Sequence, residues 1–312
     1  MYPVISIIFP VFSLILLGYL TGKFGLFKDT ASTELNYFVL WLALPAQLFS
    51  YTSKNKAQIL EQPLFLVAFL GGALLIYLLM YLLHWRSSRS NLGANFWGLS
   101  SSYSNTGYMG IPLCMLALGE DALGPAILAT LLVVSGLFSI SIVGIELGQQ
   151  KASSWSQSIV PIVRALLKNP LLIAPIAGFA WSYSELDLYA PVRQGLELLG
   201  AAASPCALIS IGLFLVKKSH VRIDGMVTLV SLKLIVQPFV TWVIAGPILG
   251  LPTFWVNSAI LLSALPTGTG PLMLAQYYRG DTEMISRAIF LTTLGSIFTL
   301  SFILWLIPNY LN

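Results

Sequence analysis

Charged residues are scarce in this sequence. Only 9% of its 312 residues are Asp, Glu, Lys or Arg, whereas 57% are hydrophobic, and the mean hydropathy is +0.83. Soluble domains carry about 25% charged residues, so the composition excludes an ordinary soluble protein and favours one that crosses the lipid bilayer several times. The net charge of +4 then bears on orientation in the membrane, and no nucleic-acid partner is expected.

Histidine and cysteine are also rare. The two histidines, His84 and His220, lie at the ends of apolar stretches, and the two cysteines, Cys114 and Cys206, lie within such stretches. No spacing among them suits a zinc site. A phosphate-binding loop with its lysine is missing too, which argues against direct use of ATP. We therefore expect neither an enzyme nor a bound metal or cofactor.

Long apolar runs, in contrast, fill the sequence. A transmembrane helix needs ~20 predominantly apolar residues, and ten stretches approach this length. They cover residues 3–22, 34–52, 63–84, 94–118, 124–147, 169–184, 194–216, 226–249, 254–278 and 285–307. The predicted fold is an all-α polytopic membrane protein with ten transmembrane helices. Residues 156–168 have mixed polarity and predict an interfacial segment before the sixth helix.

Lysine and arginine are distributed unevenly between the two sides that ten helices would create. With the N-terminus outside, twelve of them fall on the inner side, three on the outer side, and Lys233 lies within a helix. The inner set is Lys23, Lys28, Arg86, Arg89, Lys151, Arg164, Lys168, Lys217, Lys218, Arg222, Arg279 and Arg287, and the outer set is Lys54, Lys56 and Arg193. Because positively charged loops stay in the cytoplasm, we expect both termini on the outer face.

Two of the ten stretches contain residues that break helices. The fourth is interrupted at Asn105-Thr106-Gly107-Tyr108-Met109-Gly110-Ile111-Pro112, and the ninth at Pro266-Thr267-Gly268-Thr269-Gly270-Pro271. Proline lacks the N–H of a helical turn, and glycine lets the backbone leave helical angles. At membrane depth such a break is tolerated only where it is buried in protein or lines a watery cavity. Paired interrupted segments indicate the binding site of a transporter.

A weak internal repeat relates the two halves of the chain. A shift of 160 residues places Pro10 on Pro170, Gly18 on Gly178, Pro45 on Pro205 and Asp121 on Asp281, and a shift of 159 places Pro112 on Pro271. Five helices in each unit would make the second copy enter the membrane from the opposite face. The sequence thus predicts a 5+5 inverted repeat with broken helices four and nine crossing. Its units are residues 1–148 and 169–312, with a cytoplasmic linker at 149–168.

The run Asn105 to Leu113 resembles the signature of the auxin efflux carrier family, within the bile acid/arsenite/riboflavin transporter-like superfamily. Lys233-Leu-Ile-Val-Gln-Pro238 and Ala264-Leu-Pro266 resemble it too. The resemblance spans the chain and implies a scaffold of helices 1, 2, 6 and 7, and a transport domain of helices 3–5 and 8–10 that moves like an elevator. About 20 residues separate helices five and six, as in short bacterial members, which favours a bacterial inner membrane. The family also suggests a homodimer through a scaffold helix.

The broken helices supply the candidate substrate site. A break leaves unpaired N–H groups at the start of one half-helix and unpaired carbonyls at the end of the other, suited to an anion and to a cation or donor. The predicted cradle consists of Asn105, Thr106, Gly107, Tyr108, Gly110, Pro112, Pro266, Thr267, Gly268, Thr269, Gly270 and Pro271. The alternative is that both breaks are packing kinks, since Gly and Pro are frequent in membrane helices.

Lys233 is the basic residue placed deepest in a predicted helix. An intramembrane charge costs upward of ~3 kcal/mol and indicates a functional residue. Lys233 would either receive an anionic substrate or stabilise carbonyls at the ninth-helix break, with Gln237 on the same helix face. Alternatively, Lys233 extends to the inner surface.

Three further residues are weaker candidates. Glu146, at the end of helix five, would be either a proton-coupling carboxylate or an interfacial residue. Gln47 and Ser204 stand beside Pro45 and Pro205 and would face the transport domain if the scaffold helices kink there.

The leading functional hypothesis is a secondary transporter or facilitator of a small organic anion, a carboxylate, by alternating access. A sodium-coupled symporter of the bile-acid type is the near alternative, although no carboxylate lies at the breaks. A membrane sensor that binds a ligand without moving it, or a channel, would belong to another class. A carrier saturates, whereas a channel passes large unsaturable currents.

Overall fold

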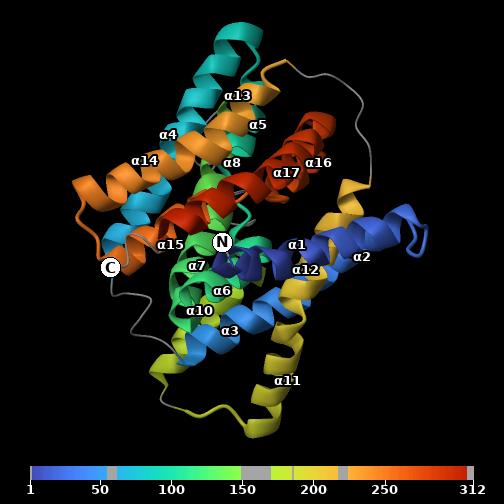
Figure 1. The fold of residues 1–312 in the computed structure, drawn as a ribbon, viewed down its shortest axis with the longest axis vertical. Coiled ribbons are helices and arrows are strands. Elements are labelled where there is room, and N and C mark those ends of the chain that lie inside the picture. Colours follow the sequence, from blue (N-terminus) through green and yellow to red (C-terminus); the bar gives the residue numbers. More distant parts are fainter. Residues whose placement is uncertain (1, 55–61, 149–169, 185, 217–223, 308–312) are drawn as a thin grey trace.

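The computed structural model describes residues 2–54, 62–148, 170–184, 186–216 and 224–307. Over these residues the protein is helical, and an isolated β-bridge is its one element of extended pairing. The predicted linker at 149–168, with its interfacial segment, lies outside the described residues. Figure 1 shows the helices arranged in two groups that meet along the middle of the molecule.

Helices of the first half begin with a long unbroken one and end with several interrupted ones. They are α1 (Tyr2–Lys23), α2 (Ala31–Phe38), η1 (Val39–Ala43), α3 (Leu44–Lys54), α4 (Pro63–Ser88), α5 (Asn91–Ser102), η3 (Thr106–Gly110), α6 (Ile111–Leu118), η4 (Glu120–Ala122), α7 (Leu123–Leu131), η5 (Leu132–Leu137) and α8 (Phe138–Gly148).

The second half begins with shorter helices and ends with the long α17 (Thr282–Leu306). Its helices are α10 (Pro170–Tyr183), α11 (Ala190–Ala201), α12 (Ala203–Leu215), α13 (Met226–Ser231), η6 (Leu232–Val236), α14 (Gln237–Val243), η7 (Ile244–Ile248), α15 (Thr253–Ser263), α16 (Gly270–Tyr278) and α17 (Thr282–Leu306). The segments η1, η3, η5, η6 and η7 are π-helical turns, and η4 is a 3₁₀ turn.

Six helical segments of the described chain are long and apolar enough to cross a bilayer. They are Val4–Lys23, Pro63–Ser88, Glu120–Ile145, Ala190–Leu215, Met226–Ile248 and Thr282–Leu306. Thr106–Leu118, Pro170–Tyr183 and Thr253–Ser263 are shorter apolar helices. Large apolar side chains such as Phe9, Val227 and Phe298 are 67%, 82% and 78% exposed, as expected where lipid replaces water as the solvent. The all-α membrane fold is thereby confirmed.

Contacts between the helices define the two groups. In the first, α1 packs on α12, α10 on α3, α11 on α3, and α12 on α2. In the second, α4 packs on α5 and α14, α14 on α15, α5 on α8, and α17 on α5 and α16. The first group has close backbone crossings: a Cβ atom on Gly212 of α12 would lie 2.0 Å from the carbonyl oxygen of Ile15 in α1.

Prolines inside the helical stretches account for three of the π-helical turns. Pro45, Pro112 and Pro238 each lie two residues after the end of such a turn, namely η1, η3 and η6. A proline ring clashes with the carbonyl four residues earlier and gives no N–H. The wider π turn moves that carbonyl aside, and the residue before each proline donates to the carbonyl five residues back. The chain therefore continues as a helix through these prolines.

Candidate functional site

The break in the fourth helical stretch lies at Tyr103–Asn105. Helix α5 ends at Ser102, Tyr103 has φ −76° and ψ 95°, and Asn105 has φ −77° and ψ 58°. The sequence predicted the break at Asn105–Pro112, and the observed break overlaps that run only at Asn105, because helical structure resumes at Thr106 as η3 and Pro112 lies in the first turn of α6. The two π-turn bonds from Gly110 and Ile111 accommodate the proline.

The break in the ninth stretch lies close to its predicted position. Helix α15 ends at Ser263, residues 264–269 are non-helical, and α16 begins with Gly270 and Pro271. Proline in the first turn of a helix lacks an N–H that would have no helical partner anyway. The sequence Pro-Thr-Gly-Thr-Gly-Pro therefore both ends one helix and starts the next.

The two breaks are joined by backbone hydrogen bonds. Ser104 and Thr267 form an antiparallel bridge. Its two bonds run from Asn105 N–H to the Pro266 carbonyl, at 2.9 Å, and from Gly268 N–H to the Tyr103 carbonyl, at 3.0 Å. Buried backbone N–H and C=O groups that leave a helix must form other hydrogen bonds. Here the backbone groups of each break bond to those of the other break. The interruptions are thus one crossing.

Lys233 and Gln237 lie beside this crossing and cap the helices that end there. Lys233 is 0% exposed, and its Nζ donates to Gln237 Oε1 at 2.7 Å, to the Ser263 carbonyl at 2.8 Å and to Ser104 Oγ at 2.9 Å. Gln237 Nε2 donates to the Ser102 carbonyl at 3.0 Å. The carbonyl ends of α5 and α15 are satisfied in this way. Full burial contradicts the alternative that Lys233 extends to the inner surface.

Thr267 fastens the crossing to two further helices. Its hydroxyl donates to the Ser100 carbonyl of α5 at 2.7 Å, and its N–H donates to Thr292 Oγ1 of α17 at 3.1 Å. All three residues are fully buried. The crossing, α5, α15 and α17 are therefore tied together by buried hydrogen bonds, whose loss would leave unpaired groups costing about 1–3 kcal/mol each.

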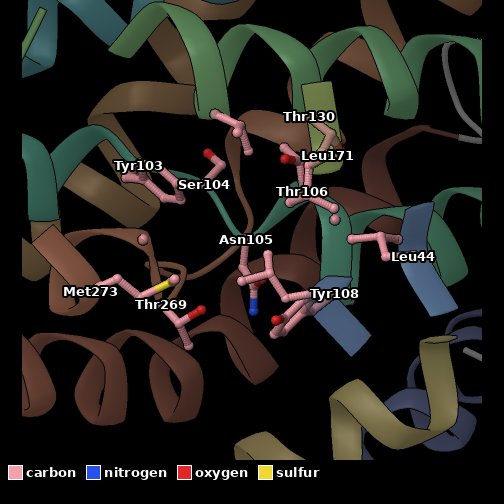
Figure 2. Close-up of a pocket in the computed structure, with 14 residues that line it drawn as sticks. Leu44, Tyr103, Ser104, Asn105, Thr106, Tyr108, Thr130, Leu171, Thr269 and Met273 are labelled. Atoms are coloured by element: carbon pink, nitrogen blue, oxygen red, sulfur yellow. The ribbon is translucent and has the colours of Figure 1, made fainter. Parts of the chain in front are cut away.

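A cavity of about 50 Å³ lies against the crossing (Figure 2). One water molecule needs roughly 10–15 Å³ of such space, so the cavity is large enough for several waters or part of a small ligand. It is lined by Leu40, Leu44, Tyr103, Ser104, Asn105, Thr106, Gly107, Tyr108, Thr130, Val134, Leu171, Thr269, Gly270 and Met273. None of these side chains is charged.

The cavity lies between the two helix groups. Leu40, Leu44 and Leu171 belong to η1, α3 and α10 of the first group, and they present an apolar wall. The broken helices, together with α7 and η5, form the rest of the lining and contribute all of its hydroxyl and amide side chains. The cavity therefore has a polar side and an apolar side, each carried by a different group of helices.

Several polar groups at the cavity have no partner among the described residues. The Asn105 amide and the Thr106 and Tyr108 hydroxyls make no side-chain hydrogen bond there, although these residues are only 7%, 2% and 7% exposed. Figure 2 shows Asn105 at the centre of the lining residues. The helical stretches that start at Thr106 and Gly270 begin at the same cavity. Their first N–H groups have no partner within the helix and form its positive end.

The cavity brings together six of the fourteen predicted substrate-binding residues. Asn105, Thr106, Gly107, Tyr108, Thr269 and Gly270 line it, whereas Gly110, Pro112, Lys233, Gln237, Pro266, Thr267, Gly268 and Pro271 do not. Tyr103 and Ser104, directly before the predicted run, belong to the lining. Thr130, Val134, Leu171, Leu40, Leu44 and Met273 join it through the packing of other helices, and neither a breaker nor a charge marks most of them in the sequence.

The weaker candidates lie elsewhere. Gln47 of α3 packs against α11, where a Cβ on Gly200 would lie 3.0 Å from the Gln47 Cα. Neither Gln47 nor Ser204 lines the cavity, and the Gln47 Oε1 is buried without a partner among the described residues. Glu146 lies in α8, but its side chain is outside what the structure describes, so its coupling role stays a prediction.

The family model described as "Membrane transport protein" matches residues 3–304 of this chain. The chain belongs to the auxin efflux carrier family of membrane transport proteins. The resemblance in the broken fourth helix is thereby confirmed, and the protein is a membrane transporter of this family.

Three relatives match this chain over nearly its full length. A protein of Rhizobium meliloti (strain 1021), provisionally named a malonate transporter, is 28% identical over 99% of this chain and 97% of its own. An uncharacterized transporter of Methanocaldococcus jannaschii is 26% identical over 97% and 99%. Auxin efflux carrier component 8 of Arabidopsis thaliana is 24% identical over 92% and 93%.

Proposed function

We propose that this protein is a secondary transporter or facilitator that moves a small organic anion, a carboxylate, across the membrane by elevator-type alternating access. The observation that carries the proposal is the cavity at the helix crossing. It offers unpaired polar groups and the positive ends of two helical stretches, and the buried Lys233 lies one side chain away, bonded to the lining residue Ser104.

The charges around the cavity favour an anion. No carboxylate among the described residues pairs with Lys233, and the lining itself is uncharged. An isolated buried charge is costly, and a carboxylate in the cavity would offset it while accepting hydrogen bonds from the Asn105 side chain and from N–H groups in the first turns of η3 and α16. The name of the Rhizobium meliloti relative, a malonate transporter, is consistent with this substrate class.

The proposal includes ten membrane-spanning helices in a 5+5 inverted repeat with both termini outside. Contacts between the halves support it. A Cβ on Gly18 would lie 2.2 Å from the Ile209 carbonyl oxygen, and one on Gly178 would lie 2.6 Å from that of Phe49. Gly178 is 160 residues after Gly18, and Ile209 is 160 residues after Phe49. An exchange of equivalent contacts is what a two-fold relation between inverted repeats requires.

The different polarity of the two helix groups at the cavity supports an elevator-type motion of one group against the other. We assign the scaffold to α1, η1, α2, α3 and α10–α12, and the transport domain to the helices that contain the crossing. The side chains of Leu40, Leu44 and Leu171 form the apolar wall and offer no hydrogen-bonding group that would hold the polar side of the cavity to one position. The transport domain could therefore slide along this wall with the substrate bound, which would expose the cavity on alternate sides.

Replacing Asn105 with alanine tests the site. A hydrogen bond to a charged group contributes about 1.5–3 kcal/mol, so Asn105→Ala should weaken carboxylate binding about 10- to 100-fold and leave the protein folded. The measurement is the rise in melting temperature that small carboxylates, malonate included, produce in the purified protein, followed by uptake into sealed vesicles.

Asn257→Ala is the matched control. Asn257 is also buried, in α15, but it does not line the cavity, so its replacement should leave the ligand response unchanged. Equal responses in Asn105→Ala and the wild type would contradict the proposed site. Binding without saturable uptake by the wild type would favour a sensor, and unsaturable currents would favour a channel.

A further inference from the structure

The hydrogen bonds of Lys233 bear on its charge. Its Nζ has three oxygen atoms within 2.9 Å: Gln237 Oε1, the Ser263 carbonyl and Ser104 Oγ. Gln237 Nε2 donates one hydrogen to the Ser102 carbonyl at 3.0 Å, so the Gln237 side-chain oxygen faces Lys233. Ser104 directs its own hydrogen to the Ser263 carbonyl at 3.3 Å. All three neighbours of Nζ therefore act as acceptors.

Three acceptors require three donors. A lysine ammonium has three N–H donors and no acceptor, whereas a neutral amine has two donors and a lone pair that would face an oxygen. The arrangement fits the ammonium. Each of the three acceptors is an uncharged group, and no acidic side chain of the described chain bonds to it. A protonated Lys233 would bring one uncompensated positive charge to the crossing.

We propose that Lys233 is a resident counter-charge, which moves with the substrate site and neutralises a substrate carrying one negative charge. This inference rests on the proposed function. Lys233 is bonded to both broken helices, through Ser104 and Ser263, so it moves with the crossing. The loaded transport domain then carries no net charge at the site, and the empty one carries a single positive charge.

This distribution of charge determines which step of the cycle responds to voltage. Exchange of substrate for substrate uses only the loaded form, so its rate should not depend on membrane potential. Net uptake also requires the empty form to return, and that step moves a positive charge through the field. One charge crossing the whole field changes an equilibrium about 50-fold per 100 mV, and a partial crossing changes it less.

The test compares exchange and net uptake in the same vesicles. The probe is labelled malonate, buffered between its two ionisations so that it carries one negative charge, and a potassium gradient with valinomycin sets the potential. For the wild type we expect net uptake to change several-fold over 100 mV and exchange to change less than about two-fold. Exchange that varies with potential as strongly as net uptake would overturn the inference.

Lys233→Met moves the charge from one step to the other. The loaded form would then carry one negative charge and the empty form none, so exchange should become dependent on potential. Net uptake should keep a dependence on potential, because each cycle still moves one negative charge across the field. Exchange that stays independent of potential in a folded Lys233→Met protein would also overturn the inference. Should this variant not fold, the wild-type comparison decides alone. Saturable uptake of none of the tested carboxylates would instead overturn the proposed function.

Discussion

Gly212→Ala is expected to destabilise the protein by about 1–3 kcal/mol or more, the range found when a packed interior is overfilled. The added Cβ would lie 2.0 Å from the Ile15 carbonyl oxygen and 2.6 Å from the Tyr19 nitrogen. Both are backbone atoms of α1, which cannot rotate away, so α1 and α12 would have to separate. Thermal unfolding of the purified protein in detergent should show a clearly lowered melting temperature.

Two other glycines make this prediction specific. Gly195→Ala, on an exposed face of α11, adds a Cβ that meets nothing within 4 Å. Since alanine is favoured over glycine in a helix by up to ~1 kcal/mol, this variant should melt as the wild type does or slightly higher. Gly178→Ala should resemble Gly212→Ala, because its Cβ would lie 2.2 Å from Thr52 Oγ1. Equal melting of Gly212→Ala and Gly195→Ala would disprove the close crossing.

The all-helical fold could be predicted from the sequence because it follows from the length of the apolar stretches alone. Each predicted stretch is helical over most of its described residues. The exact break in the fourth stretch could not be predicted in the same way. Pro112 is a helix breaker in water, but a π turn absorbed it, and the chain left the helix earlier, at Tyr103, where the partner segment offers hydrogen bonds. The position of this break depends on hydrogen bonds to a segment far away in the sequence, so no pattern in the neighbouring residues indicates it.

The role of the glycines in the breaks also differs from the prediction. Sequence reasoning gave Gly107 and Gly110 the task of adopting unusual backbone angles, yet neither has a positive φ. They lie against other side chains instead: a Cβ on Gly110 would lie 2.8 Å from Leu265 Cδ1, and one on Gly107 would lie 3.2 Å from Leu44 Cδ2. A glycine in a sequence indicates that a side chain is not tolerated, and only the packing tells whether the cause is conformation or space.

The predicted polar site residues fall into two groups: those with hydrogen-bond partners in the protein and those whose side chains face the cavity. Lys233, Gln237 and Thr267 are as polar as Asn105 and Thr106, and the sequence made all five candidates for substrate binding. In the structure the first three hold the broken helices together, and the last two are left for a ligand. Hydrogen-bond partners 30 to 167 residues away decide this division, so periodicity and composition could not.

Gly270→Ala should abolish or strongly reduce transport without unfolding the protein. Gly270 lines the cavity as the first residue of α16, and its Cβ would lie 2.3 Å from Tyr103 Cζ. The Tyr103 ring packs edge-on against Phe138 and covers Gly268, so the space left for it is the cavity, which it already lines. Relieving this clash, which would cost about 1–3 kcal/mol, moves the Tyr103 ring into the space of the ligand. If the same free energy is lost from ligand binding, the affinity falls about 5- to 150-fold.

The measurement pairs uptake and ligand-induced stabilisation with a rescue. Gly71→Ala is the control, because its Cβ would make only an ordinary contact, 3.8 Å from Ile244 Cδ1, and it should transport as the wild type does. If Tyr103 blocks the cavity in Gly270→Ala, then Tyr103→Ala in that background removes the ring and should restore part of the uptake. A Gly270→Ala protein that binds carboxylates with unchanged affinity would show that the ligand lies elsewhere than against the crossing. A double variant that stays inactive although it melts like the wild type would show that the steric account is wrong.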